Sequence, residues 1–381
     1  MVTEAIDQRF MRRAIELAQR GLFSTDPNPR VGCVIVINDR IIAEGWHEKA
    51  GQNHAEIMAI ENCQESLKGA TCYVSLEPCS HFGQTSPCSD ALIKAEVARV
   101  VVAMEDPNPQ VSGNGISCLR EAGITVDVGL MEEESADLNP GFIKRMKTGL
   151  PWVTCKVAMS IDGRTAMASG ESQWITSEKS RQEIQLLRAR SSAVITGSGT
   201  VIIDNPSMNV RADDFPNSYQ QDAEIVQPWR VIMDSNLSVS RSSKIFTLEG
   251  RVIWMTTKEI DESLNTEQLI RLQISADDEG KVRPDLVLKW LGEQGCNEVM
   301  IEAGSNLSGA FINADLVDRL VVYMAPKVLG DDARGLLHLP GLEKLSDAKQ
   351  FQLLNARILG SDLCITYGSA SSLDETLTTK E

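Results

Sequence analysis

One imidazole and two thiols near the start of the chain have the residue types and spacing of a metal site. His54 and Glu56 stand in the segment HAE, and Cys79 and Cys88 each follow a proline in EPCSHFGQTSPC. One histidine and two thiolates form a three-ligand zinc set, which leaves the fourth tetrahedral position open for water, as a catalytic zinc requires. Cys88 begins a predicted helix, where free N–H groups and the helix dipole favour a thiolate.

Glu56 lies two residues after the candidate ligand His54 and is the candidate proton carrier. The order His-x-Glu followed by Pro-Cys is that of zinc deaminases, in which the glutamate acts as general acid and base. Other interpretations stay open. Free cysteines are often buried and inert, and a structural zinc would take His81 or Cys72 as a fourth ligand but would leave Glu56 without a role. A redox pair is disfavoured because the spacing is not C-x-x-C.

The composition narrows the class of substrate. Eight residues, SHFGQTSP, separate the two cysteines, whereas nucleic-acid deaminases with this signature usually have two there, and the net charge is −16 with no basic block. Both features disfavour a polynucleotide and favour a small pyrimidine or purine. No apolar run reaches the length of a membrane span. The N-terminal segment has helical rather than targeting character, and nine cysteines in such a chain indicate the reducing cytoplasm.

The elements that must position these residues alternate between helix-like and strand-like patterns. An amphipathic helix is predicted within 1–22, strands at 31–37, 71–76 and 99–104, and helices at 54–63, 89–95 and 116–123. This alternation predicts a layered α/β domain with a largely parallel sheet. An acidic stretch and the turn signals Pro140-Gly141 and Gly149-Leu150-Pro151 follow, so we expect a domain boundary near residue 147.

A second α/β pattern follows, with strands predicted at 152–160, 193–196, 230–233, 251–255, 298–302 and 318–326, and helices at 177–191, 285–295 and 305–314. No G-x-G-x-x-G follows its first strand, which disfavours a Rossmann domain. The segment EAGSNLSGA (302–310) joins a strand to a helix, so its backbone N–H groups offer a phosphate site; a plain turn is the alternative.

Several composite motifs resemble one family. PNPRVGCVIV, GWH, HAE and EPCSHFGQTSPC in the first half, and KVAMSIDGRTAMASGESQWIT in the second, are similar to the bifunctional riboflavin-biosynthesis deaminase/reductases over about residues 7–368. The resemblance implies a cytidine-deaminase-like three-layer α/β/α domain (1–147) and a dihydrofolate-reductase-like α/β domain (148–368). It implies one Zn²⁺ per chain, NADPH, and a homodimer or homotetramer built through the reductase domain. The tail (369–381) has few apolar residues and is expected to be disordered.

The activity implied by the resemblance has two steps. The first is zinc-dependent hydrolytic deamination of 2,5-diamino-6-(5-phosphoribosylamino)pyrimidin-4(3H)-one, and the second is NADPH-dependent reduction of the ribosyl group of 5-amino-6-(5-phosphoribosylamino)uracil to a ribityl chain. Two alternatives stay open. The second half is a non-catalytic nucleotide-binding domain in one, and the whole chain is a zinc-stabilised binding protein in the other. Glu56 argues against the latter, because a structural zinc needs no carboxylate there.

The resemblance also implies roles for individual residues. It makes His54, Cys79 and Cys88 the zinc ligands and Glu56 the proton shuttle, in agreement with the chemistry above. It places in the pyrimidine and phosphate pocket Asn28, His47 and His81. Cofactor contacts are implied for Ala158, Trp174, Thr200, Asp204, Ser235, Gly304, Ser305, Asn306, Leu307, Ser308, Gly309 and Ala310. Substrate contacts are implied for Ser172, Arg188, Met208, Arg211 and Glu302, and Lys156 is expected to reach the sugar.

Three points of chemistry follow from these assignments. Two arginines, Arg188 and Arg211, are suited to bind the substrate phosphate bidentately. Asp204 is the first candidate for the proton donor of the reduction. The family usually has Leu-Thr where this chain has Met208-Asn209, and a methionine fills a leucine-sized space.

Overall fold

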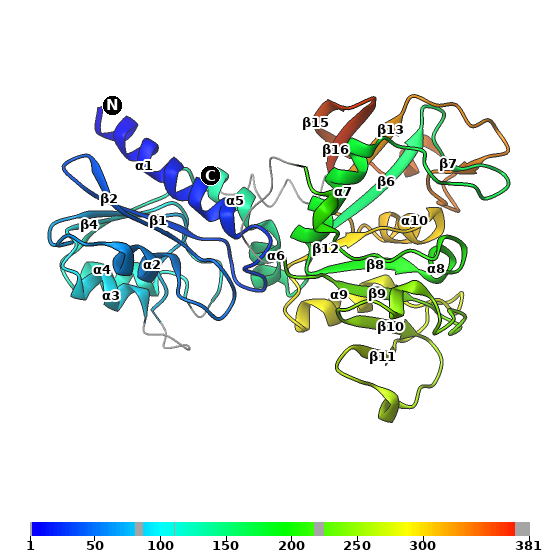
Figure 1. Cartoon of the computed structure of the whole chain (residues 1–381), viewed down its shortest axis with the longest axis horizontal. Helices are drawn as coiled ribbons and strands as arrows, with labels where there is room; N and C mark the ends of the chain where they lie inside the picture. Colours follow the sequence, from blue (N-terminus) through cyan, green and yellow to red (C-terminus); the bar gives the residue numbers. More distant parts are fainter. Residues whose placement is uncertain (1, 81–86, 110, 217–224, 370–381) are drawn as a thin grey trace. The chain divides into compact units, whose positions relative to one another are not determined.

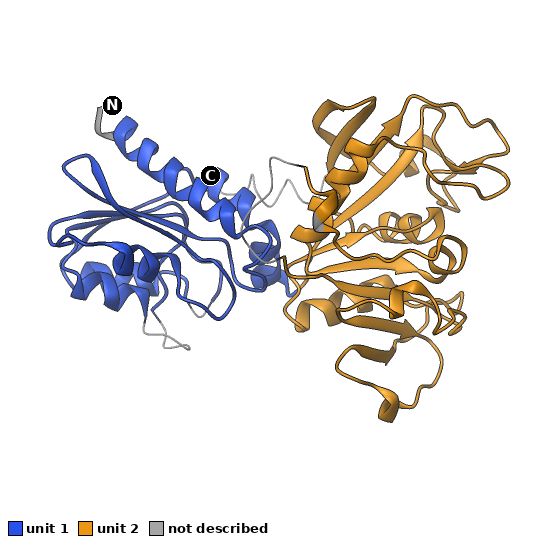
Figure 2. Ribbon diagram, in the orientation of Figure 1, with its two compact units in different colours: residues 1–149, 221–224 blue, residues 150–220, 225–381 orange. Residues whose placement is uncertain are grey.

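The computed structural model describes residues 2–80, 87–109, 111–216 and 225–369. The predicted disordered tail falls outside these residues, apart from its first position. The chain divides into two compact units, one up to Gly149 and one from Leu150 onward (Figure 2). No helix in the described ranges is long and apolar enough to cross a membrane.

The first unit is built on a five-stranded sheet with the order β2-β1-β3-β4-β5 (Figure 1). Its strands are β1 (Gly32–Ile37), β2 (Arg40–Trp46), β3 (Thr71–Val74), β4 (Arg99–Val102) and β5 (Thr125–Val128). β1 runs antiparallel to both β2 and β3, and β3, β4 and β5 run parallel. Two of the four strand pairs are therefore antiparallel, so the sheet is mixed rather than largely parallel as expected.

Helices cover both faces of this sheet. On one face lie α1 (Val2–Ala18) and α5 (Glu132–Leu138); on the other lie α2 (Ala55–Asn62), α3 (Cys88–Lys94) and α4 (Asn114–Glu121). The two-residue period of a strand explains the division, because successive side chains point to opposite faces. In β1, Val34 packs with the residues of α1, whereas Cys33 and Ile35 pack with those of α2. The three-layer α/β/α arrangement is confirmed.

The second unit is built on a nine-stranded sheet with the order β11-β10-β9-β8-β12-β6-β13-β16-β15. Its strands are β6 (Trp152–Ser160), β8 (Ala193–Gly197), β9 (Trp229–Met233), β10 (Val252–Thr256), β11 (Leu269–Gln273), β12 (Glu298–Ile301), β13 (Arg319–Ala325), β15 (Phe351–Leu359) and β16 (Asp362–Ser369). Neighbours from β11 to β13 run parallel, and β16 and β15 add an antiparallel edge. Two short strands, β7 (Arg164–Ala166) and β14 (Arg334–Gly335), pair separately.

Four helices pack against the faces of the large sheet, namely α7 (Glu178–Arg190), α8 (Ser198–Asp204), α9 (Pro284–Glu293) and α10 (Ser305–Asn313). The main apolar cluster joins strand residues such as Ile195 and Val299 to Leu288 of α9 and Phe311 of α10. Parallel strands buried on both faces have nearly continuous apolar sequences. This is why β8, β9, β10 and β12 were recognisable from sequence.

Most strands that sequence reasoning missed lie at the edges of the two large sheets. The unpredicted strands are β2, β5, β7, β11, β14, β15 and β16; β2, β5, β11 and β15 are edge strands, and β7 and β14 form a separate pair. The acidic segment read as a linker instead forms α5, and the predicted turn at Pro140-Gly141 begins α6 (Pro140–Thr148). Proline is favourable in the first turn of a helix, because its missing N–H has no partner there. A Pro-Gly pair therefore marks a helix start here rather than a turn.

A buried arginine fixes one end of the large sheet. Arg230 on β9 is 1% exposed. Its Nη1 donates to the carbonyl of Ile245 (2.7 Å), and its Nη2 lies 2.7–3.0 Å from the carbonyls of Leu248, Glu249 and Gly250. Burial lowers the pKa of Arg230. The guanidinium thus satisfies four carbonyls of a loop that has no regular strand or helix partner for them.

We predict that Arg230→Met destabilises the second unit by roughly 3 kcal/mol, because each buried acceptor left without a donor costs about 1–3 kcal/mol. Denaturant unfolding of the variant and of the unchanged protein measures the difference in free energy. Arg283→Met is the matched control, since Arg283 pairs with Asp285 at the surface (2.6 Å) and surface pairs contribute about 0–1 kcal/mol. Equal losses in the two variants would contradict the role given to Arg230.

Candidate active sites

The three predicted metal ligands converge from separate elements of the first unit. His54 is the residue before α2, Cys88 is the first residue of α3, and Cys79 lies in the loop after β3. The Sγ atoms of Cys79 and Cys88 lie 3.5 Å and 3.3 Å from Nδ1 of His54. All three ligand atoms lie within 4.8 Å of one another, and no other cluster of this kind is found in the described part of the chain.

The electrostatics of this cluster suit a divalent cation. Hydrogen bonds from the Cys88 thiol and from His54 lower the pKa of Cys79 to about 4, against the effect of burial. The backbone N–H of Cys88 also points at Cys79 Sγ (3.4 Å). The pKa of Cys88 is raised in contrast, because its thiol donates a hydrogen bond to Cys79 and because Cys88 is buried. One imidazole and two sulfurs are a fitting donor set for Zn²⁺, which would hold both sulfurs as thiolates.

Glu56 is buried next to these ligands. It lies in the first turn of α2 and is 3% exposed. Burial raises the pKa of Glu56 to about 7, with the nearby His54 opposing the shift and Cys79 adding to it. A carboxyl group that titrates near neutrality is suited to take up and release a proton during a reaction.

His47 and Asn28 lie beside the cluster, as expected for pocket residues. The ring of His47 stands edge-on to that of His54 with 5.4 Å between centroids. Nδ1 of His47 is 3.0 Å from the carbonyl of Asn53, and Nε2 is 3.1 Å from Nδ2 of Asn28. Because a carbonyl only accepts, Nδ1 carries the proton and Nε2 accepts from the amide. Burial lowers the pKa of His47, which favours this neutral form. His81 lies outside the described residues.

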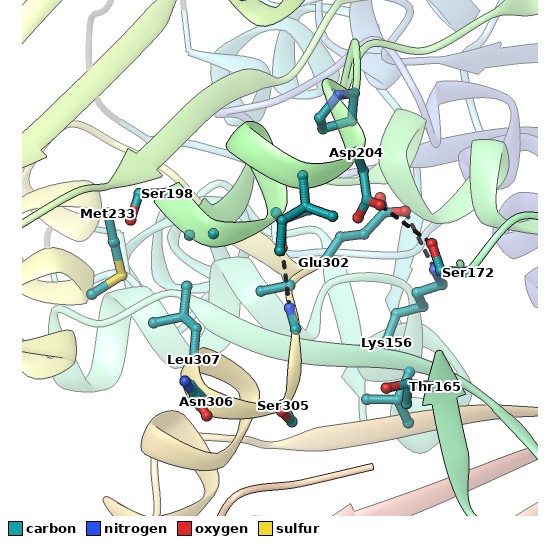
Figure 3. Close-up of a pocket in the computed structure, with 18 of the residues that line it drawn as sticks. Lys156, Thr165, Ser172, Ser198, Asp204, Met233, Glu302, Ser305, Asn306 and Leu307 are labelled. Atoms are coloured by element: carbon teal, nitrogen blue, oxygen red, sulfur yellow. Dashed lines mark hydrogen bonds and ion pairs between the residues drawn. The ribbon is translucent and has the colours of Figure 1, made fainter. Parts of the chain in front are cut away.

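The second predicted site is a cavity at the carboxyl ends of the parallel strands (Figure 3). Gly197 at the end of β8, Met233 at the end of β9 and Glu302 after β12 all line it. In the close-up, Lys156, Ser172, Asp204 and Glu302 lie together on one side. Every cofactor and substrate residue assigned to this half by resemblance lines the cavity, except Ser308.

Ser308 differs from its assignment for a structural reason. Its side chain is fully buried, and its hydroxyl donates to the carbonyl of Ala303 (3.3 Å). Its backbone N–H bonds to the carbonyl of Gly304 (3.1 Å). In a helix, neighbouring positions face different directions, so Ser308 faces the core whereas Ser305 and Asn306 line the cavity.

Glu302 is the centre of a charged group in the cavity wall. Its oxygens accept from Nε (2.8 Å) and Nη2 (3.0 Å) of Arg188 and from Nζ of Lys156 (3.3 Å). Burial alone would raise the pKa of Glu302, but Arg188 and then Lys156 outweigh it and hold the pKa at about 2. Arg188 also donates to the carbonyl of Asn209 (2.9 Å).

Both arginines expected to bind the substrate phosphate line the cavity, and each already has a carboxylate partner. Arg188 is 8% exposed and is bound bidentately by Glu302. Arg211 lines the cavity but pairs with Asp214 (2.5 Å). Glu302 follows Arg188 by 114 residues, so the sequence offered no sign of the pair.

The remaining predicted contacts differ in exposure. Trp174 and Met208 both line the cavity, but Trp174 is 61% exposed, whereas Met208 is 1% exposed and belongs to a buried apolar cluster. The hydroxyl of Ser172 donates to Asp204 (3.2 Å), which fixes that carboxylate. The N–H of Gly304 donates to the hydroxyl of Thr200 (3.2 Å), which joins the loop before α10 to α8.

Two kinds of residue were missed by sequence reasoning. The first hold Trp174: Arg181 stands over its ring (4.7 Å to the centroid), and Lys327 donates to its carbonyl (2.7 Å). The second is Glu77, which stands in the segment EPC before Cys79. It is 4% exposed, and its carboxylate accepts hydrogen bonds from four backbone N–H groups. The one sign of its importance in the sequence was an acidic residue placed next to the proline that precedes Cys79.

Comparisons with known proteins bear on both sites. Residues 4–104 match the cytidine and deoxycytidylate deaminase zinc-binding region, and residues 151–365 match the RibD C-terminal domain. The riboflavin biosynthesis protein RibD of Escherichia coli (strain K12) is 48% identical, with 94% of this chain and 98% of that relative covered. The match of the second half argues against a non-catalytic nucleotide-binding domain.

Two solved structures share the whole fold. Acinetobacter baumannii RibD (form 1) aligns with a TM-score of 0.89 and 44% identity, covering 96% of this chain and 99% of that one. A diaminohydroxyphosphoribosylaminopyrimidine deaminase/5-amino-6-(5-phosphoribosylamino)uracil reductase of Thermotoga maritima aligns with a TM-score of 0.85 and 34% identity, covering 97% and 100%. The chain therefore belongs to the RibD family and is a bifunctional deaminase and reductase of riboflavin biosynthesis that uses Zn²⁺ and NADPH.

Proposed function

We propose that His54, Cys79 and Cys88 hold the zinc ion and that Glu56 carries the proton of the deamination. The observation that supports this assignment is the convergence of the three ligand atoms within 4.8 Å beside a buried carboxyl group. We assign deamination to residues 1–147 and reduction to residues 148–368. The relative from Thermotoga maritima supports 2,5-diamino-6-(5-phosphoribosylamino)pyrimidin-4(3H)-one as the first substrate.

The residues of the first unit divide the work of hydrolysis. A bound Zn²⁺ supplies a water molecule of lowered pKa. Glu56 takes the two protons of the attacking water in turn and delivers one to the ring nitrogen and one to the amine that leaves as ammonia, so that the ring carbon exchanges C–N for C=O. Neutral His47 lies beside His54 and is hydrogen-bonded to Asn28, so both residues are candidates for contact with the pyrimidine ring.

We predict that Glu56→Gln retains zinc and loses deamination by about 10²–10⁴-fold, the range typical of a general acid–base group. Metal analysis and ammonia release measure the two effects. The variant should still oxidise NADPH when given the deaminated intermediate. Removal of zinc by a chelator should likewise abolish deamination alone. Loss of zinc from Glu56→Gln, or an unchanged deamination rate, would refute the assigned role.

We infer that the cavity of the second unit binds NADPH and the sugar phosphate. NADPH supplies the hydride, and the protein must hold donor and acceptor in near-attack geometry. Opening of the sugar ring converts the ribosylamine to an imine; the hydride adds to C1′ and a proton to the nitrogen. Lys156, fixed by Glu302, is placed to bind the sugar, and Asp204, fixed by Ser172, is the first candidate for proton transfer.

We predict that Glu302→Gln lowers kcat of the reduction at least 10-fold, because Lys156 and Arg188 lose the charge that positions both of them. The assay is NADPH absorbance with the deaminated intermediate. Glu298→Gln is the matched control: Glu298 begins β12, the strand that Glu302 directly follows, and it pairs with Arg190 of the same helix, α7 (2.6 Å). Glu298 does not line the cavity, so this variant should keep kcat. Equal kcat losses would mean that only stability was changed.

We also propose that the protein is a cytoplasmic homo-oligomer assembled through the second unit. All nine cysteines are free, which fits a reducing compartment. The edge strand β15 exposes Leu353 (58%), Leu354 (46%) and Ile358 (82%). A long edge strand with exposed apolar side chains is usually covered by another chain or is a site of aggregation.

We predict that Ile358→Lys dissociates the oligomer, which sedimentation would detect as a lower mass. Sedimentation of the unchanged protein also decides between a dimer and a tetramer. Leu345→Lys is the control, because Leu345 is equally apolar and 91% exposed but lies outside β15. An oligomer that survives Ile358→Lys would exclude this face of β15.

A further inference from the structure

Glu77 is a buried carboxylate that the proposed deamination does not use. Its Oε2 accepts the backbone N–H groups of Asp106 (3.1 Å) and Gly113 (3.0 Å). Its Oε1 accepts those of Gly115 (2.9 Å) and Ile116 (3.2 Å). The last two belong to the first turn of α4, where N–H groups have no partner within the helix. Four donors and the helix dipole together compensate the buried charge.

The same residue is connected to a proposed zinc ligand by a single proline. Pro78 has a fixed φ and stands between Glu77 and Cys79. The turn fits tightly against α4, because a Cβ placed on Gly115 would lie 1.9 Å from the carbonyl oxygen of Pro78. The segment before the ligand is therefore held against the N-terminus of α4 by side chain and backbone alike.

The other side of the ligand is held by a second helix. The N–H of Cys88 points at Cys79 Sγ (3.4 Å), and the N–H of Ser89 donates to the carbonyl of Cys79 (3.2 Å). Both donors lie in the first turn of α3. Cys79 belongs to a loop, so its position depends on these two attachments, and Glu77 makes the attachment to α4.

We propose that Glu77 is a positioning residue for the deaminase: it fixes Cys79 so that its sulfur meets His54 and Cys88 at metal-binding distance. The role requires a carboxylate, since an amide has one oxygen and would direct its NH₂ group at two N–H donors. The proposal rests on the proposed ligand set. It predicts that the metal site loosens when Glu77 loses its second oxygen, even though Glu77 does not touch the metal.

The test uses the full-length protein with Glu77→Gln. We expect zinc affinity, measured by competition with a chromophoric chelator, to fall about 10- to 100-fold, as for residues that orient metal ligands. Substitution with Co²⁺ provides a readout of geometry, and its visible absorption bands should shift or weaken. Reduction of the deaminated intermediate should continue, because it takes place in the other unit.

Asp7→Asn is the matched control for general destabilisation. Asp7 is also a buried carboxylate of the first unit (7% exposed), bound by Arg99 (2.8 and 2.9 Å) and Tyr73 (2.5 Å). It lies on α1, which covers the face of the sheet opposite to the ligands. We expect Asp7→Asn to lower the melting temperature but to leave zinc affinity and the Co²⁺ spectrum unchanged. Wild-type zinc affinity in Glu77→Gln, or an equal loss in Asp7→Asn, would overturn the proposal.

Two further variants separate the possible failures. Gly115→Ala displaces Pro78 without removing a charge and should weaken zinc binding in the same way. If Glu77→Gln does not fold, Gly115→Ala is the deciding variant. Wild-type zinc affinity in Gly115→Ala would then overturn the proposal. Cys79→Ser tests the ligand set itself. Zinc retained at full affinity in Cys79→Ser refutes the ligand assignment, whereas zinc lost from Cys79→Ser but kept by Glu77→Gln refutes only the role of Glu77.

Discussion

Both units depend on one constraint: a charge buried away from water must be compensated by fixed hydrogen-bond partners or by an opposite charge. The second unit meets it with ions at Glu302, where two cations surround one carboxylate, and with dipoles at Arg230, where four carbonyls surround one guanidinium. The first unit meets it with backbone N–H groups at Glu77. In each case the partners come from segments distant in sequence, so the buried charge also fixes how those segments meet.

The deaminase centre uses the ends of helices for this purpose. His54 precedes α2 and Cys88 begins α3, so two helix N-termini, where negative charge is favoured, lie at the cluster, and the N–H of Cys88 points at Cys79 Sγ. The sheet sets the spacing of these helices through close contacts such as Gly45, where a Cβ would lie 2.4 Å from the backbone of Ala55. A small residue on β2 thus determines how closely α2, and with it His54, approaches the sheet.

The sequence was most informative where chemistry restricts the residue type. The proposed ligands in HAE and in the two Pro-Cys pairs stood out because few side chains bind zinc, and the buried strands because they are continuously apolar. Sequence reasoning failed at β15, which exposes most of its residues and owes its pairing to β16 alone. It also failed at Arg188, since an arginine on a helix is usually solvated and nothing local indicates Glu302. Pairings over 100 residues follow from topology, which local patterns do not contain.

A comparison of Glu56 with Glu302 shows how environment assigns opposite roles to one residue type. Burial raises the pKa in both cases. Near Glu56 the neighbouring groups are a histidine that opposes the shift and a thiolate that adds to it, so the pKa comes to about 7 and the carboxyl group can exchange a proton at neutral pH. Near Glu302 the neighbours are Arg188 and Lys156, which bring the pKa to about 2. Glu302 therefore stays charged throughout the physiological range and acts as a fixed anchor for cations. The same side chain titrates near neutrality in one unit and is a permanent counter-ion in the other, and the difference arises from what is packed beside it.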